Sequence, residues 1–243
     1  MKNTVIIIPS RLDAKRFPNK PLAKINNVPM IVHVLNRAKE SKVGEVFVAT
    51  PDSEISKIVE ENGGKAILTQ SDHKSGSDRV FEAYTKVIKR NVDLIINLQG
   101  DMPNITPSSI SKLINLMRSN SCDIGTLASN VIDKKDIMDR NVVKVHIEES
   151  LNDNNFLNAK DFFRMNKDLN YKKIYYHIGI YAFTNIALNK YVKLSRSKLE
   201  IERNLEQMRA MENKMPIKVG LSDSNPLGVD TEEDLIKVSQ EMN

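Results

Sequence analysis

The sequence predicts an α/β protein with a doubly wound, mostly parallel sheet. In the first half of the chain, short apolar runs alternate with segments of helical periodicity. The first run, Thr4–Pro9, is continuously apolar and rich in β-branched residues, which is typical of strands buried on both faces of a sheet. The 243 residues are sufficient for one full hydrophobic core. We therefore expect one α/β domain with a full core, or one domain plus a lobe, over residues 1–243.

The elements of the first half follow from apolar spacing. Apolar runs of strand length predict strands at Thr4–Pro9, Glu45–Thr50, Lys65–Thr69 and Asp93–Leu98. Apolar residues at helical spacing predict the helices between them, at Met30–Lys39, Ile55–Asn62 and Ser77–Arg90. The pair Gly63-Gly64 ends the second of these helices, because glycine is the usual residue after a helix C-terminus.

The second half is less regular between residues 131 and 176. The same patterns predict strands at Asp123–Ala128, Val142–His146, Ile178–Phe183 and Ile217–Leu221. They predict helices at Ser108–Ser119, Leu199–Asn213 and Thr231–Met242, the last capped by Thr231 with Asp234 three residues on. The Asn- and Lys-rich segment Leu151–Lys173 has a composition that allows a mobile loop within it.

Composition excludes several classes of protein. The formal charge of +5 comes from 36 basic residues dispersed among 31 acidic ones, and aromatic residues make up 5%, so we expect no nucleic-acid partner. Cys122 is the single cysteine, which excludes an internal disulfide, and we interpret it as a small buried hydrophobe. No apolar run approaches the roughly 18 residues of a membrane span and no signal peptide is evident, so we expect a cytoplasmic protein without a membrane partner.

Ligands of doubly wound sheets bind beyond the carboxyl ends of the strands. Segment 10–20 follows the first strand and carries Arg11, Lys15, Arg16 and Lys20, which can converge on a triphosphate. The segment has neither the P-loop pattern nor the glycine pattern of dinucleotide sites. The alternative is an ordinary solvated basic loop.

Two acids also follow expected strand ends. Asp101 lies after Gly100, where a carboxylate can hold magnesium against phosphates, and Asp230 lies close to Gly228. If both carboxylates face one crevice, they suit magnesium-dependent phosphate chemistry. The alternatives are a turn cap for Asp101 and a helix cap for Asp230.

Two further segments carry candidate binding residues. Segment 72–79 has small polar residues that can donate to a base or a phosphate, with Arg79 at the start of a helix; the alternative is an N-cap. Period-two spacing places His177, Gly179 and Tyr181 on one face of a strand, although such a histidine is usually structural. The default for the acids of the predicted helix at 199–213, Glu200, Glu202 and Glu206, is a solvated face.

The ordered motifs resemble the 3-deoxy-manno-octulosonate cytidylyltransferase family, and the resemblance covers nearly the whole chain. They are Ile8–Leu22, Pro29–Val34, Asp72–Arg79, Asn97–Asp101, Val142–Val145, His177–Tyr181, Leu199–Glu200, Leu205–Arg209 and Gly228–Asp230. The resemblance implies a nucleotide-diphospho-sugar transferase fold with a small α+β dimerisation insert, and a sugar-binding and dimerisation subregion over about 131–195. It also implies a homodimer and a role in lipopolysaccharide biosynthesis.

The implied activity is magnesium-dependent attack of the 2-hydroxyl of an acidic eight-carbon sugar on the α-phosphate of CTP, which gives the CMP-sugar and pyrophosphate. By match to the family motifs, catalysis is assigned to Lys20, Arg11 and Asp101, and Mg²⁺ to Asp101 and Asp230. Nucleotide binding is assigned to Pro9, Arg11, Lys20, Thr69, Ser75, Gly76, Arg79 and Gln99. Sugar binding is assigned to Gln99, His177, Tyr181, Glu206 and Gln207.

This chain departs from the family pattern at two places. Met102 stands where many relatives have glutamate, and Leu157-Asn158 stands where relatives carry Ser-Arg. An arginine expected near the sugar acid is therefore missing, and Lys160 or Arg164 is a candidate substitute. The alternatives are the same chemistry on a related ulosonic acid, such as an 8-amino analogue or a sialic acid, or a non-catalytic nucleotide-binding homologue.

Overall fold

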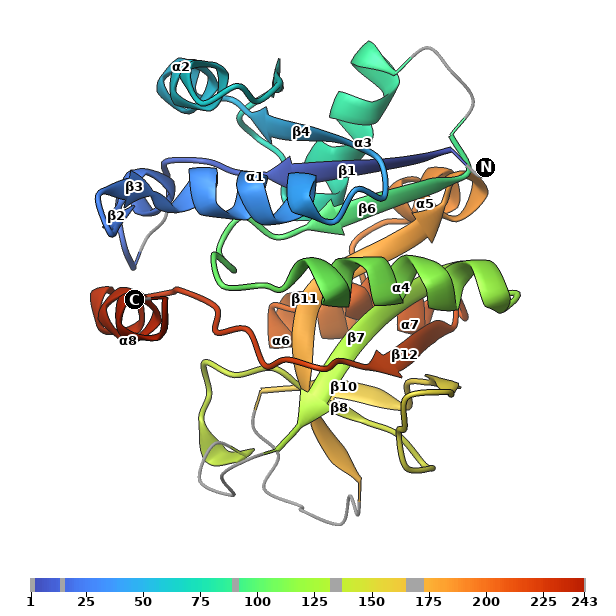
Figure 1. The fold of residues 1–243 in the computed structure, drawn as a ribbon. Helices are drawn as coiled ribbons and strands as arrows, with labels where there is room; N and C mark the ends of the chain where they lie inside the picture. Colours follow the sequence, from blue (N-terminus) through green and yellow to red (C-terminus); the bar gives the residue numbers. More distant parts are fainter. Residues whose placement is uncertain (1–2, 14–15, 89–91, 132–136, 165–172, 243) are drawn as a thin grey trace. The chain divides into compact units, whose positions relative to one another are not determined.

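The computed structural model describes residues 3–13, 16–88, 92–131, 137–164 and 173–242. The chain divides into two compact units (Figure 1). Unit 1 comprises residues 1–111 and 226–243, and unit 2 comprises residues 112–225. Helix α4 (Pro107–Ser119) includes the boundary between them.

Unit 1 is built on four parallel strands. Their order is β5 (Ala66–Leu68), β4 (Glu45–Thr50), β1 (Thr4–Pro9) and β6 (Leu94–Leu98). In β1, Ile6 pairs with Val46 of β4 on one side and with Ile96 of β6 on the other. All six residues of β1 are buried, as the unbroken apolar run predicts for a central strand.

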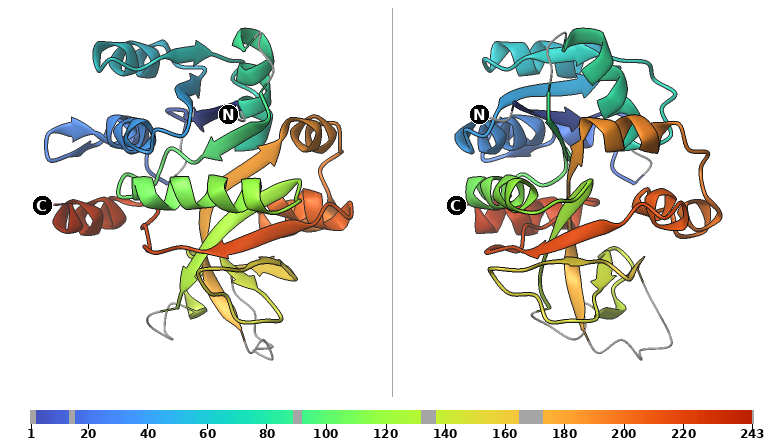
Figure 2. Two further views of the ribbon diagram at one scale, coloured as in Figure 1. Left: turned by 45° about the vertical axis from the view of Figure 1, so that its right-hand side comes forward. Right: turned by 90° about the vertical axis from the view of Figure 1, so that its right-hand side faces the viewer.

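Helices cover both faces of this sheet. α1 (Met30–Glu40) and α2 (Ser53–Glu61) lie on one face, and α3 (Gly76–Val87) lies on the other (Figure 1; Figure 2). Right-handed crossovers require this arrangement, because the chain runs from β1 outward to β5 and then returns to the opposite side of β1. The strand order therefore reverses between β1 and β6, which is the position where doubly wound sheets bind ligands.

The last residues of the chain belong to unit 1. The 3₁₀ helix η1 (Lys20–Leu22) and the hairpin of β2 (Lys24–Ile25) and β3 (Val28–Pro29) precede α1, and α8 (Glu232–Glu241) packs against this region. Buried apolar side chains from both ends of the chain form one cluster there: Phe17, Ile25, Met30, Val229 and Val238. This cluster holds the segment around Asp230 against the loop after β1.

Unit 2 has a mixed sheet. β7 (Ile124–Asn130) pairs antiparallel with β11 (Ile174–Thr184) and parallel with β12 (Ile217–Leu221), and β9 (Phe156–Asn158) pairs antiparallel with β12. β8 (Lys144–His146) lies between β11 and β10 (Asp161–Phe163). The helices are α5 (Asn185–Val192), α6 (Lys198–Arg203) and α7 (Gln207–Glu212).

Two sequence predictions need correction. The single helix expected at 199–213 is wrong, because Asn204 adopts a left-handed conformation with φ 51° and separates α6 from α7. The segment 151–173 contains β9 and β10, and its residues 165–172 lie outside the described ranges, so the mobile loop expected within it is not tested. Cys122 is half-buried rather than buried, and burial raises the pKa of its thiol to about 11, so it remains protonated.

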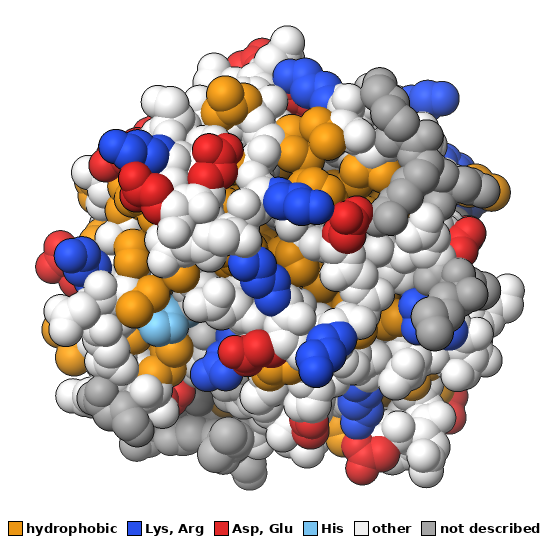
Figure 3. Space-filling model, turned by 45° about the horizontal axis from the view of Figure 1, so that its top comes forward, with side chains coloured by type: hydrophobic (Ala, Val, Ile, Leu, Met, Phe, Trp, Pro, Cys, Tyr) orange, Lys and Arg blue, Asp and Glu red, His pale blue; other side chains and the backbone are white. Residues whose placement is uncertain are grey.

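On the face in Figure 3, the Lys and Arg side chains of the described residues are interspersed with Asp and Glu. Among the described residues, none of the helices combines the length and apolar character that a membrane crossing needs.

Candidate functional site

The carboxyl ends of β1 and β6 lie side by side in unit 1, and glycine permits their close approach. A Cβ on Gly100 would lie 3.1 Å from the Pro9 carbonyl oxygen. A Cβ on Gly76 would lie 3.0 Å from Gln99 Nε2 and 3.3 Å from Pro9 Cγ. The structure therefore brings together Pro9, Gly76 and Gln99, which the sequence assigns to nucleotide binding.

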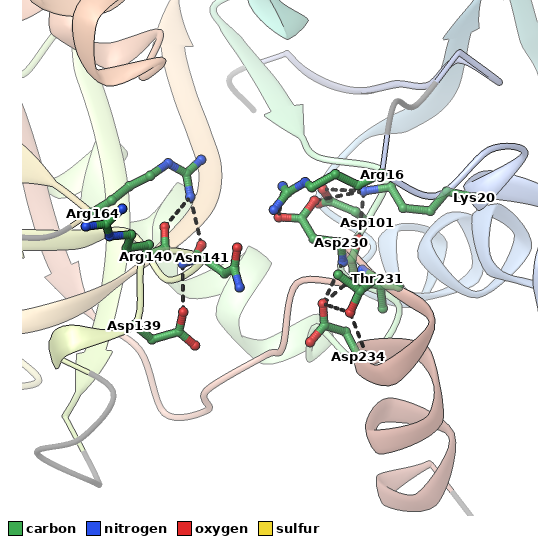
Figure 4. Close-up of polar contacts among 11 residues, drawn as sticks. Arg16, Lys20, Asp101, Asp139, Arg140, Asn141, Arg164, Asp230, Thr231 and Asp234 are labelled. Atoms are coloured by element: carbon green, nitrogen blue, oxygen red, sulfur yellow. Dashed lines mark hydrogen bonds and ion pairs between the residues drawn. The ribbon is translucent and has the colours of Figure 1, made fainter.

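The main polar feature of this region is a lysine between two aspartates. Lys20 Nζ lies 3.2 Å from Asp101 Oδ2 and 3.3 Å from Asp230 Oδ1, and it donates a 2.7 Å hydrogen bond to the Val229 carbonyl oxygen. Figure 4 shows the ammonium between the two carboxylates. The pair of acids that sequence reasoning placed in one crevice therefore does meet, with Lys20 bridging the two side chains.

The opposite charges in this cluster stabilise one another. Burial lowers the pKa of the Lys20 ammonium, but the charges and hydrogen bonds of Asp101 and Asp230 outweigh it and leave that pKa above its ordinary value. Arg16 Nη2 lies 2.7 Å from the second oxygen of Asp230 and is half-exposed. Sequence analysis placed Arg16 in the phosphate loop but did not identify this ion pair.

The start of α8 fixes the position of Asp230. The Val229 amide donates a 2.9 Å hydrogen bond to the Asp101 carbonyl oxygen, which joins the two backbones directly. The amides of Asp230 and Thr231 both donate to Asp234 Oδ2, at 3.1 and 2.9 Å. In return, the Asp234 amide donates to the Thr231 hydroxyl, which completes the capping box that the sequence predicts.

The loop before α3 is held from inside by a buried arginine. Arg79 is 3% exposed, and its Nη1 donates to the Thr69 hydroxyl at 2.5 Å and to the Gln70 carbonyl oxygen at 2.7 Å. Burial and the nearby charge of Arg11 lower the pKa of Arg79. Ser75 caps α3, and its hydroxyl donates to Asp78 Oδ2. In this structure both side chains stabilise the loop that the sequence assigns to the nucleotide.

Glu82, which sequence analysis did not single out, ties the same loop to α3. It accepts hydrogen bonds from the His73 ring, the Gln70 amide and Lys86 Nζ. Burial by itself raises the pKa of the Glu82 carboxyl. The hydrogen bonds from these donors have the larger combined effect and lower the pKa to about 2. Only the Lys86 pair has a regular i,i+4 spacing; Gln70 and His73 reach Glu82 because the preceding loop folds back onto α3.

Not all of the predicted cations join the acidic pair. Arg11 is exposed, and within the described part of the chain no ion pair links it to Asp101 or Asp230. Lys15 lies outside the described residues. The loop is instead anchored through the Leu12 amide, which donates to Asp52 Oδ2 at 2.8 Å.

In unit 2, His177 and Tyr181 are neighbours although the strand between them is irregular. A β-bulge lies between Ile178 and Tyr181, yet the rings of His177 and Tyr181 remain 5.3 Å apart. Burial, and to a smaller extent the charge of Arg164, lowers the pKa of His177 to about 3, so its imidazole is neutral. Burial also raises the pKa of Tyr181 well above its ordinary value, with a further contribution from Glu206.

The region of α6 and α7 holds the other predicted sugar residues. Glu206 precedes α7 and its carbonyl oxygen accepts a 2.8 Å hydrogen bond from the Tyr191 hydroxyl, and Gln207 is buried at the first turn. Glu200 is not on a solvated face: it is 1% exposed and accepts bonds of 2.9 and 2.7 Å from Arg209. The solvated-face expectation is therefore wrong for Glu200.

Lys144 is a buried cation that sequence reasoning left without a role. It is fully buried, and its ammonium donates to the carbonyl oxygens of Asp139 and Val142 at 2.6 and 2.8 Å. It thus fixes the turn that precedes β8. Arg164 Nη1 donates to the carbonyl oxygen of Asn141, in the same turn, at 2.8 Å (Figure 4).

The donor set of Asp101 and Asp230 fits magnesium. Within the described ranges, no group of three or more His, Cys, Asp or Glu side chains is arranged as a metal cage. Magnesium does not require one, because it is commonly held by one or two carboxylates together with water and substrate phosphates. The Lys20 ammonium already lies between the two carboxylates, which is evidence that this position attracts a cation.

The chain is similar to known cytidylyltransferases. A family model described as cytidylyltransferase matches residues 5–217. The chain is 43% identical, over 96% of both sequences, to 3-deoxy-manno-octulosonate cytidylyltransferase of Bartonella tribocorum. It is 42% identical to the enzyme of the same name from Brucella ovis, over 96% of this chain and 92% of that one.

Solved structures agree with these matches. The structure of CMP:2-keto-3-deoxy-manno-octonic acid synthetase complexed with CTP superposes with a TM-score of 0.87 and 36% identity, covering 99% of this chain and 98% of that one. The 4-diphosphocytidyl-2C-methyl-D-erythritol synthase of Anaerococcus prevotii has a TM-score of 0.65 at 15% identity, with 99% and 98% coverage, and supports the fold alone. The predicted α/β nucleotide-diphospho-sugar transferase fold is thereby confirmed.

Proposed function

Because the chain belongs to the cytidylyltransferase family, among the 3-deoxy-manno-octulosonate cytidylyltransferases, we propose that it converts CTP and 3-deoxy-manno-octulosonate to the CMP-sugar and pyrophosphate. A bond forms between the sugar 2-oxygen and the α-phosphorus of CTP while the bond to the β-phosphate oxygen breaks. The hydroxyl proton is released to solvent as the bond forms, and pyrophosphate takes the electron pair of the broken bond. The observation that carries the proposal is the Lys20 cluster at the reversal point of a doubly wound sheet.

CTP is assigned to unit 1. Lys20, Arg11 and the amides of the loop after β1 supply positive charge for the triphosphate, and Lys20 stabilises the charge on departing pyrophosphate. Pro9, Gly76 and Gln99 line the approach, while Thr69, Ser75 and Arg79 hold the adjacent loop. Ser10 Oγ, at the tip of β1, is buried and has no hydrogen-bond partner in the described part of the chain. A ligand donor or acceptor at the strand tip would satisfy it.

Magnesium is assigned to Asp101 and Asp230. A bound magnesium ion would supply Lewis-acid stabilisation of the phosphate oxygens. The protein's part is to hold two carboxylates at a fixed separation, through the Val229–Asp101 backbone hydrogen bond and the capping box of α8. Lys20 keeps their charges balanced before substrate binds.

The sugar is assigned to His177, Tyr181, Glu206 and Gln207 of unit 2, with Gln99 of unit 1. Neutral imidazole, phenol, carboxylate and amide groups together offer both donors and acceptors to a polyhydroxylated acid. Met102 is 4% exposed and packs as a core residue, while Asn158 is exposed on β9. Because of these two departures from the family pattern, the assay should compare the octulosonate with other ulosonic acids.

A pyrophosphate-release panel tests the proposal. Purified protein is incubated with magnesium, each of the four ribonucleoside triphosphates, and the octulosonate, its 8-amino analogue or a sialic acid. We expect release with CTP and the octulosonate, and formation of the CMP-sugar by mass spectrometry. Faster release with another ulosonic acid would reassign the substrate. No release with any combination would contradict the enzyme proposal and favour a non-catalytic nucleotide-binding homologue.

The domain organisation, the assembly and the compartment also remain proposals. We infer one nucleotidyltransferase domain over 1–243, a sugar-binding and dimerisation subregion over about 131–195, and a cytoplasmic homodimer. The family membership supports these inferences. Light scattering should give about twice the chain mass of 27.6 kDa, and a mass of one chain would contradict the dimer.

A further inference from the structure

The β-bulge in β11 directs several groups to one hydroxyl. Thr126 of β7 is fully buried, and its Oγ1 lies 2.7 Å from the Ile180 carbonyl oxygen and 3.2 Å from the Ile178 carbonyl oxygen. The same oxygen lies 3.0 Å from Nε2 of His177. The ladder register shifts between Ile178 and Tyr181, which turns these carbonyl groups toward Thr126.

The single proton of the Thr126 hydroxyl determines the tautomer of His177. A threonine hydroxyl has one proton to donate and two lone pairs that accept. Two oxygens at 2.7 Å require a proton between them, and a carbonyl oxygen has none, so the hydroxyl donates to Ile180. The hydroxyl then has no proton for His177, and the 3.0 Å contact is a hydrogen bond only if Nε2 carries the proton.

We propose that Thr126 is a positioning residue that holds His177 as the Nε2–H tautomer, so that Nδ1 presents a lone pair to a hydroxyl of the acidic sugar. This inference rests on the proposed function, which assigns His177 to the sugar. A neutral ring with this tautomer accepts a hydrogen bond at Nδ1 and cannot donate one there. The specificity is therefore for a hydroxyl or ammonium donor at the matching position of the substrate.

The surroundings of the ring keep this arrangement constant over the neutral pH range. Phe162 contacts the imidazole edge-on with ring centroids 5.1 Å apart, and Tyr181 lies on it at 5.3 Å. The charged group that acts on the ring is Arg164, whose positive charge disfavours a second proton, as burial does. Phe162 lies on β10, and Arg164 is the residue directly after the end of that strand.

Nitrogen-15 NMR of histidine tests the tautomer directly in the full-length protein. The chain has four histidines, and the His177 signals are assigned by their loss in His177→Gln. We expect long-range correlations showing a protonated Nε2 and an unprotonated Nδ1 at pH 7. A proton on Nδ1 in the wild-type protein would overturn the proposal without any mutant being needed.

Two substitutions at Thr126 separate the hydroxyl from its packing. Thr126→Ser keeps the hydroxyl and should keep the tautomer. Thr126→Val keeps the shape, and we expect a mixed tautomer population with a KM for the octulosonate raised about tenfold, the equivalent of one lost hydrogen bond. The KM for CTP should change less than about twofold. Wild-type behaviour of the valine variant, or loss of the tautomer in the serine variant, would overturn the role of Thr126.

The tautomer readout also distinguishes this inference from the proposed function. If no sugar and nucleotide combination is turned over but Nε2 is protonated, the enzyme proposal fails and the assignment of the Thr126 hydrogen bonds stands. If the octulosonate is turned over but Nδ1 is protonated, the enzyme proposal stands and the positioning role fails. A valine variant that does not fold leaves the wild-type and serine spectra to decide.

Discussion

At the scale of single residues, the Lys20 ammonium lies between the two carboxylates proposed to hold magnesium. Its pKa is raised by those carboxylates despite burial, so it stays charged throughout the neutral range. If CTP binds as proposed, this fixed positive charge lies beside the phosphates and stabilises the negative charge that develops on the leaving group. It also separates Asp101 from Asp230, which would otherwise repel each other.

Replacing Lys20 with methionine should remove this stabilisation while keeping the length of the side chain. We expect kcat for pyrophosphate release to fall about 10²- to 10³-fold, the typical loss when one preorganised charge stabiliser is removed. Lys24→Met is the matched control, because Lys24 is exposed four residues along the chain. Equal activity of the two variants would remove Lys20 from the proposed mechanism.

His177 should make folding stability depend on pH. Its pKa is about 3 in the native protein and about 6.5 in an unfolded chain, so the unfolded state binds more protons between these values. Stability is therefore full above pH 6.5 and falls as the pH decreases, by about 2 kcal/mol at pH 5 from this group. Glu82 contributes little between pH 7 and pH 5, because its stabilisation is lost only as the pH falls below its ordinary pKa of 4.5 toward about 2.

Urea unfolding at pH 7 and pH 5 measures this effect. His177→Gln should reduce the difference in free energy of unfolding between the two pH values. Part of the difference should remain, because burial also lowers the pKa of His146. An unchanged difference in the variant would show that the His177 ring accepts a proton in the native protein.

At the scale of elements, the interruption between α6 and α7 shows where sequence patterns fall short. Apolar spacing over 199–213 predicts one continuous helix, since each half has helical periodicity. The left-handed Asn204 reverses the chain direction, so that Glu200 of α6 and Arg209 of α7 form a buried two-point ion pair. Periodicity carries no information on such a pair, because it forms only after the chain turns.

Removing one charge of the Glu200–Arg209 ion pair should lower the free energy of unfolding. Glu200→Gln leaves Arg209 buried beside a neutral amide, and we expect a loss of about 3–5 kcal/mol in the free energy of unfolding. Glu202→Gln is the matched control, because Glu202 lies two residues on with a half-exposed side chain. For Glu202→Gln, the loss in the free energy of unfolding should stay within about 0.5 kcal/mol. Urea denaturation at pH 7 measures both, and similar values would contradict the assignment.

At the scale of the whole molecule, the sequence predicted the residues of the site better than their contacts. Local patterns predicted the parallel strands of unit 1, the capping box of α8, and Asp101 shortly after a strand. Asp230 is not at a strand end, because β12 ends at Leu221 and Asp230 lies immediately before the N-cap of α8. Local patterns also did not predict that Arg79 is buried or that Arg16, and not Arg11, pairs with Asp230. Those facts depend on contacts between segments distant in sequence, and a single sequence carries no direct record of such contacts.

The apolar cluster of unit 1 should couple the end of the chain to the proposed metal site. Val238→Ala removes a fully buried side chain from α8 opposite Phe17 and Met30, and should lower the free energy of unfolding by about 2 kcal/mol. It should also raise the magnesium concentration needed for half-maximal pyrophosphate release, because α8 positions Asp230.

Ile236→Ala is the control for this variant. Ile236 lies on the same helix and is 58% exposed, so its loss should change neither stability nor the magnesium requirement. A Val238→Ala protein that is destabilised but has an unchanged magnesium requirement would show that Asp230 is held independently of α8 packing.

The return of the chain to unit 1 also has a consequence for biosynthesis. Lys20 and Asp230 are 210 positions apart, so at translation rates of roughly 5–20 residues per second the aspartate is made about 10–40 seconds after its lysine partner. During that interval the nascent polypeptide has Lys20 and later Asp101, but it still lacks Asp230, the second aspartate of the proposed metal site. A nascent or prematurely terminated product that lacks residue 230 would therefore not carry both acids, and the ability to consume CTP would arise only after Asp230 has been made.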